Sequence, residues 1–126
     1  MQTDTAHLQK ARQRLVDQAR RDAYRDDRLQ QTAQADAKAI MDMIVRDFSP
    51  RRIYQWGSLV RPGAFKSYSD IDIAVEGVID PERFFALLGQ AQALTRFPLD
   101  IVQIDKIAPE YADDIRKNGR LAYERA

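Results

Sequence analysis

The first 49 residues contain neither proline nor glycine, although the chain has five of each. These residues interrupt helices most strongly, and the segment is rich in alanine, glutamine and arginine, which favour a helix. One unbroken helix over residues 5–47 would be roughly 65 Å long, which exceeds the diameter of a domain of this size. We therefore expect the helix either to protrude or to break, most readily at Asp26-Asp27-Arg28, with Thr32 as the N-cap of a second piece.

Two apolar stripes of different strength lie along this helical segment. The stronger one has spacings of three and four residues, as on a helix face that packs against a sheet, and consists of Ala33, Ala37, Ile40, Ile44 and Phe48. Residues 8–23 carry a thinner stripe of leucine and alanine among many charges. This thinner face is either solvated or the seam of a dimer or partner interface, because so narrow a stripe buries little area by itself.

Beyond residue 49, turn residues alternate with short apolar runs. We predict strands at residues 53–56, 70–75 and 97–104, helices at 81–94 and 107–118, and a short edge strand at the C-terminal end. Phe84, Phe85, Tyr111 and Ile115 are expected to point inward from the two helices. The order indicates an α+β fold with α/β-type packing, in which helices cover one small mixed sheet. We expect a single domain, with residues 1–48 as a helical extension and 49–126 as an α/β core.

The composition excludes several kinds of site. Without cysteine, the chain has no disulfide, thiol nucleophile or cysteine-based zinc site, and its one histidine, His7, cannot form a multi-histidine site. Twenty basic and 19 acidic residues nearly balance, so no electrostatic footprint for nucleic acid is visible. No apolar run is long enough for a membrane span or signal peptide, and we expect a soluble, cytoplasmic protein.

The chemistry-bearing residues gather between two apolar runs. Gly57-Ser58 follows the first run, and Asp70 and Asp72 stand one residue apart at the start of the second. In a strand, residues i and i+2 share a face, so the two carboxylates project together. Paired carboxylates suit Mg²⁺, and a Gly-Ser turn offers backbone N–H groups and a hydroxyl to a phosphate. This combination indicates phosphoryl or nucleotidyl transfer.

A third carboxylate interrupts a later apolar run. Asp100 lies between Leu99 and Ile101, where an acid costs burial energy unless something compensates it. It is structural if it meets an arginine or caps a turn, and functional if its strand lies beside residues 70–75. Asp105, which follows the same run, is interpreted as a turn residue.

The pattern of Gly-Ser, a polar loop and Asp-x-Asp resembles the signature of the DNA polymerase β-like nucleotidyltransferases, and the small size resembles their minimal, stand-alone branch. The resemblance covers roughly residues 35–126. Eleven residues separate Ser58 from Asp70, slightly more than is usual in the family, and Arg61-Pro62-Gly63 stands where an Arg-Gly pair is usual. The tail at residues 115–123 also resembles that of the minimal branch.

The resemblance implies a polymerase β-like fold and metal-dependent transfer of AMP from ATP to a hydroxyl. It implies that Asp70, Asp72 and Asp100 hold two Mg²⁺ ions, and that Gly57 and Ser58 hold the distal phosphates. Arg61 and Lys66 are candidates for neutralising the triphosphate, although exposed loop cations are often merely solvated.

Minimal nucleotidyltransferases of this kind typically act as antitoxins, and the resemblance implies a helical HEPN-type toxin as partner, with a tyrosine of that toxin as acceptor. The N-terminal helical segment is then a docking surface or a site of homo-oligomerisation. Two alternatives stay open: a non-catalytic nucleotide-binding module that neutralises its partner by complex formation, and an enzyme acting on a small-molecule hydroxyl.

Overall fold

A computed structural model describes residues 2–126. The elements follow in the order α1 (Gln2–Phe48), β1 (Arg52–Trp56), a short 3₁₀ helix η1 (Gly57–Val60), β2 (Ile71–Glu76), α2 (Pro81–Gln92), β3 (Leu99–Gln103), α3 (Pro109–Asn118) and β4 (Arg120–Glu124). This mixture of helices and strands confirms the expected fold class. No helix within residues 2–126 is long and apolar enough to cross a membrane.

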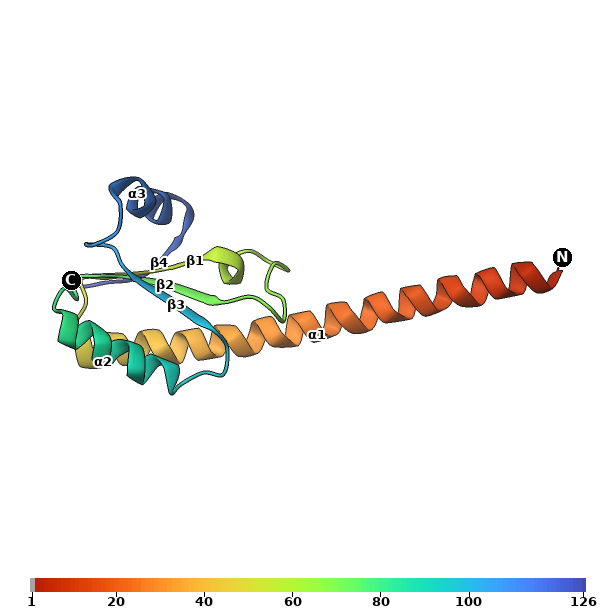
Figure 1. The fold of residues 1–126 in the computed structure, drawn as a ribbon, viewed down its shortest axis with the longest axis horizontal. Helices are drawn as coiled ribbons and strands as arrows, with labels where there is room; N and C mark the ends of the chain where they lie inside the picture. The colour runs from red at the N-terminus through yellow and green to blue at the C-terminus, as the bar shows by residue number, and fades with distance from the viewer. Residues whose placement is uncertain (1) are drawn as a thin grey trace.

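The four strands form one mixed sheet in the order β3-β2-β1-β4. β1 pairs antiparallel with β2 and with β4, while β2 and β3 are parallel. α2 makes the crossover between the two parallel strands, as such a connection requires. Figure 1 shows α1 and α2 on one face of the sheet and α3 on the other. The predicted C-terminal edge strand is present as β4.

The sheet separates two hydrophobic cores. The larger core lies against α1 and α2, and the strong stripe of α1 is buried in it as predicted, together with Ile53, Ile71, Ile73 and Val75. The smaller core lies against α3 and consists of Tyr54, Ala74, Ile104, Ala112 and Ile115. Alternate residues of β2 thus enter different cores, as the pleat of a strand requires. Asp72 lies between two members of the larger core and therefore faces the α3 side.

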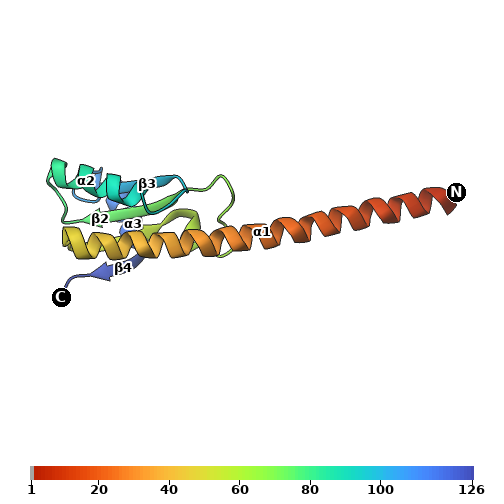
Figure 2. The same ribbon diagram turned by 90° about the horizontal axis from the view of Figure 1, so that it is seen from below.

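Of the two alternatives expected for the first helix, protrusion is the one observed: α1 is continuous and extends far beyond the sheet (Figures 1 and 2), and the break at residues 26–28 is absent. Thr32 is not an N-cap, since its hydroxyl donates to the Arg28 carbonyl oxygen one turn earlier, at 3.0 Å. Side-chain hydrogen bonds at i,i+4 also span the exposed part, one of them between Gln31 and Asp27 at 3.2 Å. Because neither glycine nor proline interrupts it, the polar stretch of α1 stays helical although it is exposed to solvent.

Two side chains expected to point inward are exposed instead. Phe85 keeps 78% of its surface and Tyr111 keeps 39%. The buried face of α2 follows residues 84, 87, 88 and 91 at helical spacing, and Phe85 lies about 100° away from it around the helix. Ile115, the other residue assigned to the inner face of α3, is buried.

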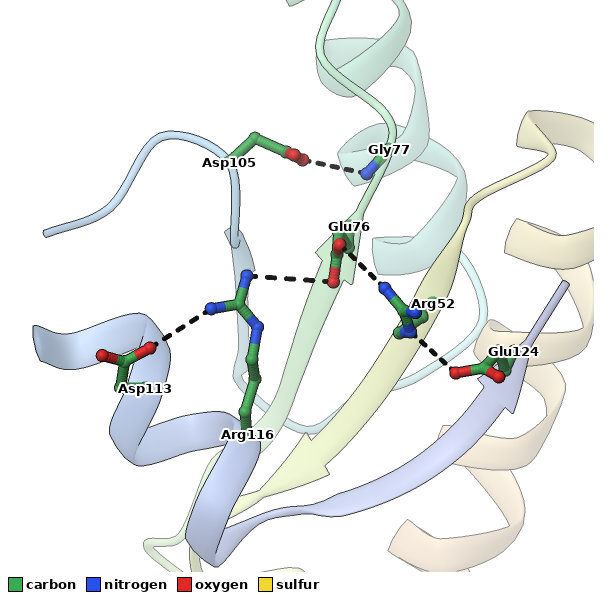
Figure 3. A network of polar contacts seen from close by, with 7 residues as sticks. All are labelled: Arg52, Glu76, Gly77, Asp105, Asp113, Arg116 and Glu124. Carbon is green, nitrogen blue, oxygen red and sulfur yellow. Dashed lines mark hydrogen bonds and ion pairs between the residues drawn. The ribbon is translucent and has the colours of Figure 1, made fainter. Parts of the chain in front are cut away.

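An ion-pair network joins the strands at the end of the sheet where β2 stops (Figure 3). Arg52 bridges the nearly buried Glu76, at 3.1 Å, and Glu124 of the edge strand, at 2.7 Å. Arg116 of α3 approaches the second oxygen of Glu76 at 4.0 Å. Asp105 lies in the turn after β3, as predicted, and accepts a hydrogen bond from the Gly77 N–H at 2.9 Å.

We expect Glu76→Gln to lower the free energy of unfolding by about 1–3 kcal/mol, because it leaves Arg52 without its buried partner. Urea denaturation measures the change. Glu124→Gln is the matched control, since it removes the other partner of Arg52 at a half-exposed position and should cost less than about 1 kcal/mol. Equal losses in the two variants would show that burial of Glu76 is not the source of the effect.

Candidate active site

The strand register brings two of the predicted acids together. Asp72 of β2 pairs directly with Asp100 of β3 on one side and with Trp56 of β1 on the other. Directly paired residues of neighbouring strands point to the same face of a sheet, so both carboxylates belong to the α3 face. Asp70 immediately precedes β2, two residues before Asp72.

The charges of the three carboxylates act on one another. Burial of Asp72, followed by the negative charges of Asp100 and then Asp70, raises the pKa of Asp72 to about 7 from an ordinary value of 3.8. Burial disfavours the ionised form, and like charges disfavour it further. A divalent cation among these oxygens would relieve both effects, and carboxylate oxygens are the ligands that Mg²⁺ prefers.

The three acids do not form a ready metal site as they stand. Within residues 2–126, no group of three or more histidine, aspartate or glutamate side chains is close enough to hold one ion. The donor chemistry of the three carboxylates fits Mg²⁺. Asp70 is exposed and Asp72 is only half-buried, so both are accessible from solvent.

Gly57 brings the Gly-Ser turn against these acids. Its φ of +76° lies in the left-handed region, and a Cβ placed on it would lie 2.9 Å from Cγ of Asp72 and still nearer to a carboxylate oxygen. Glycine is therefore required at this position both by the backbone and by the approach of Asp72. Gly57, from the turn predicted to hold phosphates, therefore lies against Asp72, one of the acids predicted to hold metal.

The two loop cations lie in different surroundings. Arg61 lines a cavity that Gly57 also lines. Lys66 points to the helical extension, where its Nζ pairs with Asp26 of α1 at 3.1 Å. The Gln30 side chain of α1 donates to the Arg61 carbonyl oxygen at 3.5 Å. The partly buried segment of α1 around Asp26 and Gln30 thus contacts the loop between the Gly-Ser turn and Asp70.

Residues of α3 that the sequence analysis did not assign to the site also border it. Tyr111 meets Trp56 edge-to-face, with ring centroids 5.7 Å apart. Burial raises the pKa of Tyr111, and the negative charges of Asp100 and Asp72 raise it further. The Tyr111 hydroxyl therefore interacts electrostatically with the acids. Asp114 and Asn118 line the cavity that Gly57 also lines. The only sequence signal for this set is helical spacing, since residues 111, 114 and 118 share a face.

A larger cavity of about 550 Å³ lies elsewhere, between α1 and the turn after α2. Its lining includes Asp36, whose carboxylate accepts a hydrogen bond from the Thr95 hydroxyl at 2.7 Å. None of the three acids borders it. The candidate site is therefore chosen not by cavity size but because Gly57 contacts Asp72 and also lines a neighbouring cavity.

Comparisons with known proteins place this fold. No protein-family model and no curated protein matches the sequence. Among solved structures, a toxin–antitoxin complex with AMP-PNP has a TM-score of 0.58 at 22% identity, covering 69% of this chain and 73% of that chain. A tri-AMPylated Shewanella oneidensis HEPN toxin in complex with an MNT antitoxin has a TM-score of 0.54 at 22% identity, covering 74% of this chain and 73% of that chain.

A third structure, described as a minimal nucleotidyltransferase, has a TM-score of 0.58 at 20% identity. The match covers 71% of this chain and 92% of that chain. At such identities the likeness establishes the fold. The chain has the fold of the minimal nucleotidyltransferases, which confirms the resemblance drawn from the Gly-Ser and Asp-x-Asp pattern at the level of architecture.

Proposed function

We propose that this protein is a Mg²⁺-dependent nucleotidyltransferase that moves AMP from ATP to a hydroxyl group of a protein partner. The observation that carries the proposal is the strand register, which sets Asp72 opposite Asp100 while Gly57 contacts Asp72. Phosphate-binding and cation-binding groups then lie side by side, as transfer of a nucleotide requires. Residues 49–126 are the catalytic core in this proposal, and residues 1–48 extend it within one domain.

Each part of the site has a role in the reaction. The N–H groups and hydroxyl of Gly57-Ser58 hold the distal phosphates, and Arg61 neutralises part of their charge. Asp70, Asp72 and Asp100 hold two Mg²⁺ ions, which when bound neutralise the phosphates and favour ionisation of the attacking hydroxyl. The acceptor oxygen forms a bond to the α-phosphorus as the bond to the bridging oxygen breaks and pyrophosphate leaves. The acceptor proton passes to an aspartate or to water, so no histidine is needed.

The partner is proposed from the structural neighbours and from the shape of α1. Two neighbours are structures of toxin–antitoxin complexes, one of them with an AMPylated HEPN toxin. We propose a HEPN-type toxin as partner of this chain, a tyrosine of that toxin as acceptor, and the cytoplasm as the compartment. The protruding part of α1 is the proposed docking surface, because Leu8, Leu15 and Tyr24 expose 68%, 72% and 64% of their surfaces.

Transfer of label tests the proposal directly. The protein is incubated with Mg²⁺ and α-labelled ATP, with and without a co-purifying partner, beside the double variant Asp70→Asn/Asp72→Asn. We expect label on the partner, its loss in the double variant, and its loss when EDTA removes the metal. Asp113→Asn, a change of the same kind at an exposed position of α3, should leave the transfer unchanged. Transfer that persists in the double variant would contradict the assigned roles.

A second candidate is a nucleotide-binding antitoxin that acts by complex formation alone. Two observations favour it: the three acids do not converge on one point in the described residues, and Lys66 pairs with Asp26 of α1 rather than lying free for a triphosphate. Nucleotide binding and partner inhibition without any label transfer would establish this candidate in place of the enzyme.

A further inference from the structure

A small cavity adjoins the candidate site on the α3 side. Its volume is about 240 Å³, and its walls come from the end of β1, the loop after it and the last turn of α3, with Trp56, Gly57, Arg61, Asp114 and Asn118 among the lining residues. Because Gly57 also contacts Asp72, the cavity opens beside the proposed phosphate site. A volume below the usual range for whole small-molecule ligands suits part of a ligand, such as one ring system.

The wall of this cavity is held in place by a close backbone approach. A Cβ on Gly119 would lie 3.1 Å from the carbonyl oxygen of Gln55 and 3.3 Å from Cβ of Trp56. The Gly119 N–H also donates to the Ile115 carbonyl oxygen at 2.8 Å. The C-terminal end of α3 therefore packs tightly on β1, and the cavity beside it is preformed.

Asp114 and the last carbonyl groups of α3 place hydrogen-bond acceptors at this wall, so the wall does not suit a phosphate. Asp114 contributes a carboxylate, and the C-terminal end of a helix carries a partial negative charge on its unpaired carbonyl groups. An uncharged ring with an exocyclic amino group suits such a wall. In a bound nucleotide, the phosphates then lie toward Gly57 and the acids, and the base lies toward α3.

Asp114 also fixes the orientation of the neighbouring amide. The Asn118 side chain donates through Nδ2 to Oδ1 of Asp114 at 2.6 Å. The amide keeps a second N–H and its carbonyl oxygen available, which is the donor–acceptor pair that an asparagine presents to adenine. Guanine and uracil carry a carbonyl oxygen where adenine carries its amino group, and that oxygen would face the Asp114 carboxylate.

We propose that this cavity receives the adenine base of the nucleotide, with Asn118 and Asp114 reading its amino edge and Trp56 forming one wall. This inference rests on the proposed function, since it assigns the base of the substrate that the acids would act on. One further observation concerns Trp56, which lines the cavity. Its Nε1–H is buried and donates to no atom of residues 2–126, so this wall contains an unsatisfied donor.

The single tryptophan of the chain makes the test simple. Isothermal calorimetry in Mg²⁺ compares the affinities of ATP, GTP, UTP and tripolyphosphate, while Trp56 emission reports occupation of the cavity. We expect ATP to bind about 10- to 100-fold more tightly than GTP or UTP. Asp114→Ala and Asn118→Ala should each weaken ATP binding by a factor of about ten or more and leave tripolyphosphate binding unchanged, which also shows that the variants are folded.

Asp113→Ala is the matched control, because it is an adjacent aspartate of α3 that does not line the cavity. It should bind ATP as the unmodified protein does. The inference is overturned if Asp114→Ala and Asn118→Ala bind ATP normally, or if ATP binds no more tightly than tripolyphosphate. The outcomes also separate the two proposals. Selective binding of ATP without transfer of label would refute the transferase and leave the adenine site standing. Transfer that depends on Asp70 and Asp72 but shows no preference among bases would refute only the adenine site.

Discussion

Asp72→Asn is expected to abolish adenylyl transfer and, at the same time, to make the metal-free protein more stable at pH 8. Asp72 is paired with Asp100, stands two residues after Asp70 in the sequence and is half-buried, so its negative charge is unfavourable in the folded chain unless a cation is present. Asparagine keeps the size of the side chain and removes the charge. Loss of a carboxylate required for transfer should reduce the rate at least about 1,000-fold, the size of effect seen when key catalytic groups are removed.

The gain in stability should depend on pH in a defined direction. The pKa of Asp72 is raised to about 7 in the folded protein from an ordinary value of 3.8. The protonated Asp72 carboxyl therefore contributes its full share to the free energy of unfolding below pH 3.8, and this contribution is lost as the pH rises through about 7. The variant cannot ionise at this position, so its advantage is greatest above pH 7 and shrinks toward pH 4. Because Asp72 is half exposed, solvent screening reduces the effect to roughly 1–2 kcal/mol, or about 5 °C in Tm.

Thermal melts in EDTA at pH 8 and pH 4.5 measure this difference, with Asp113→Asn as the exposed control. Added Mg²⁺ should raise the Tm of the unmodified protein and not that of Asp72→Asn, because only the former keeps the proposed ligand set. A variant equally stabilised at both pH values would show that repulsion among the three acids is not the cause.

Local patterns in the sequence predicted the parts of this fold that depend on short-range periodicity. The stripe from Ala33 to Phe48, the strands around Gly57 and Asp72, and the edge strand at the C-terminal end follow from such patterns. The continuity of α1 depends on a balance between helix propensity and compactness. Because residues 1–49 contain neither glycine nor proline, helix propensity prevails, and the helix extends into solvent instead of breaking.

Long-range pairing is not specified by local patterns in the sequence. No residue near Asp100 indicates by itself that β3 pairs with β2; only the family resemblance implied that Asp100 stands with Asp70 and Asp72, and the structure sets Asp100 opposite Asp72. Asp114 and Asn118 read as ordinary solvated residues of an amphipathic helix. They border the candidate site only because Gly119 allows the end of α3 to approach β1 closely. These contacts depend on the assembled sheet, which a single sequence does not specify by local propensity.

Gly57→Ala is expected to lower ATP affinity and transfer at least about 100-fold and to destabilise the protein. The left-handed backbone at this position costs an alanine roughly 1–2 kcal/mol. The added methyl group would also collide with the Asp72 carboxylate, so either the turn or the acid must move away from its partner. A displacement of this size at a site that works by positioning is enough to reduce the rate by this factor.

Gly63→Ala separates the two causes. Gly63 has a φ of +73°, nearly the same as the +76° of Gly57, but a Cβ at Gly63 would have no atom of the described chain within 4 Å apart from Gly63 itself and its two chain neighbours. It should therefore lose stability by a comparable backbone term and keep ATP binding and transfer. The double variant Gly57→Ala/Asp72→Ala should be more stable than the sum of the two single changes indicates, because removing the carboxylate makes room for the methyl group. Simple additivity, or equal loss of activity in Gly63→Ala, would mean that the approach of Asp72 to Gly57 is not what requires a glycine in the turn.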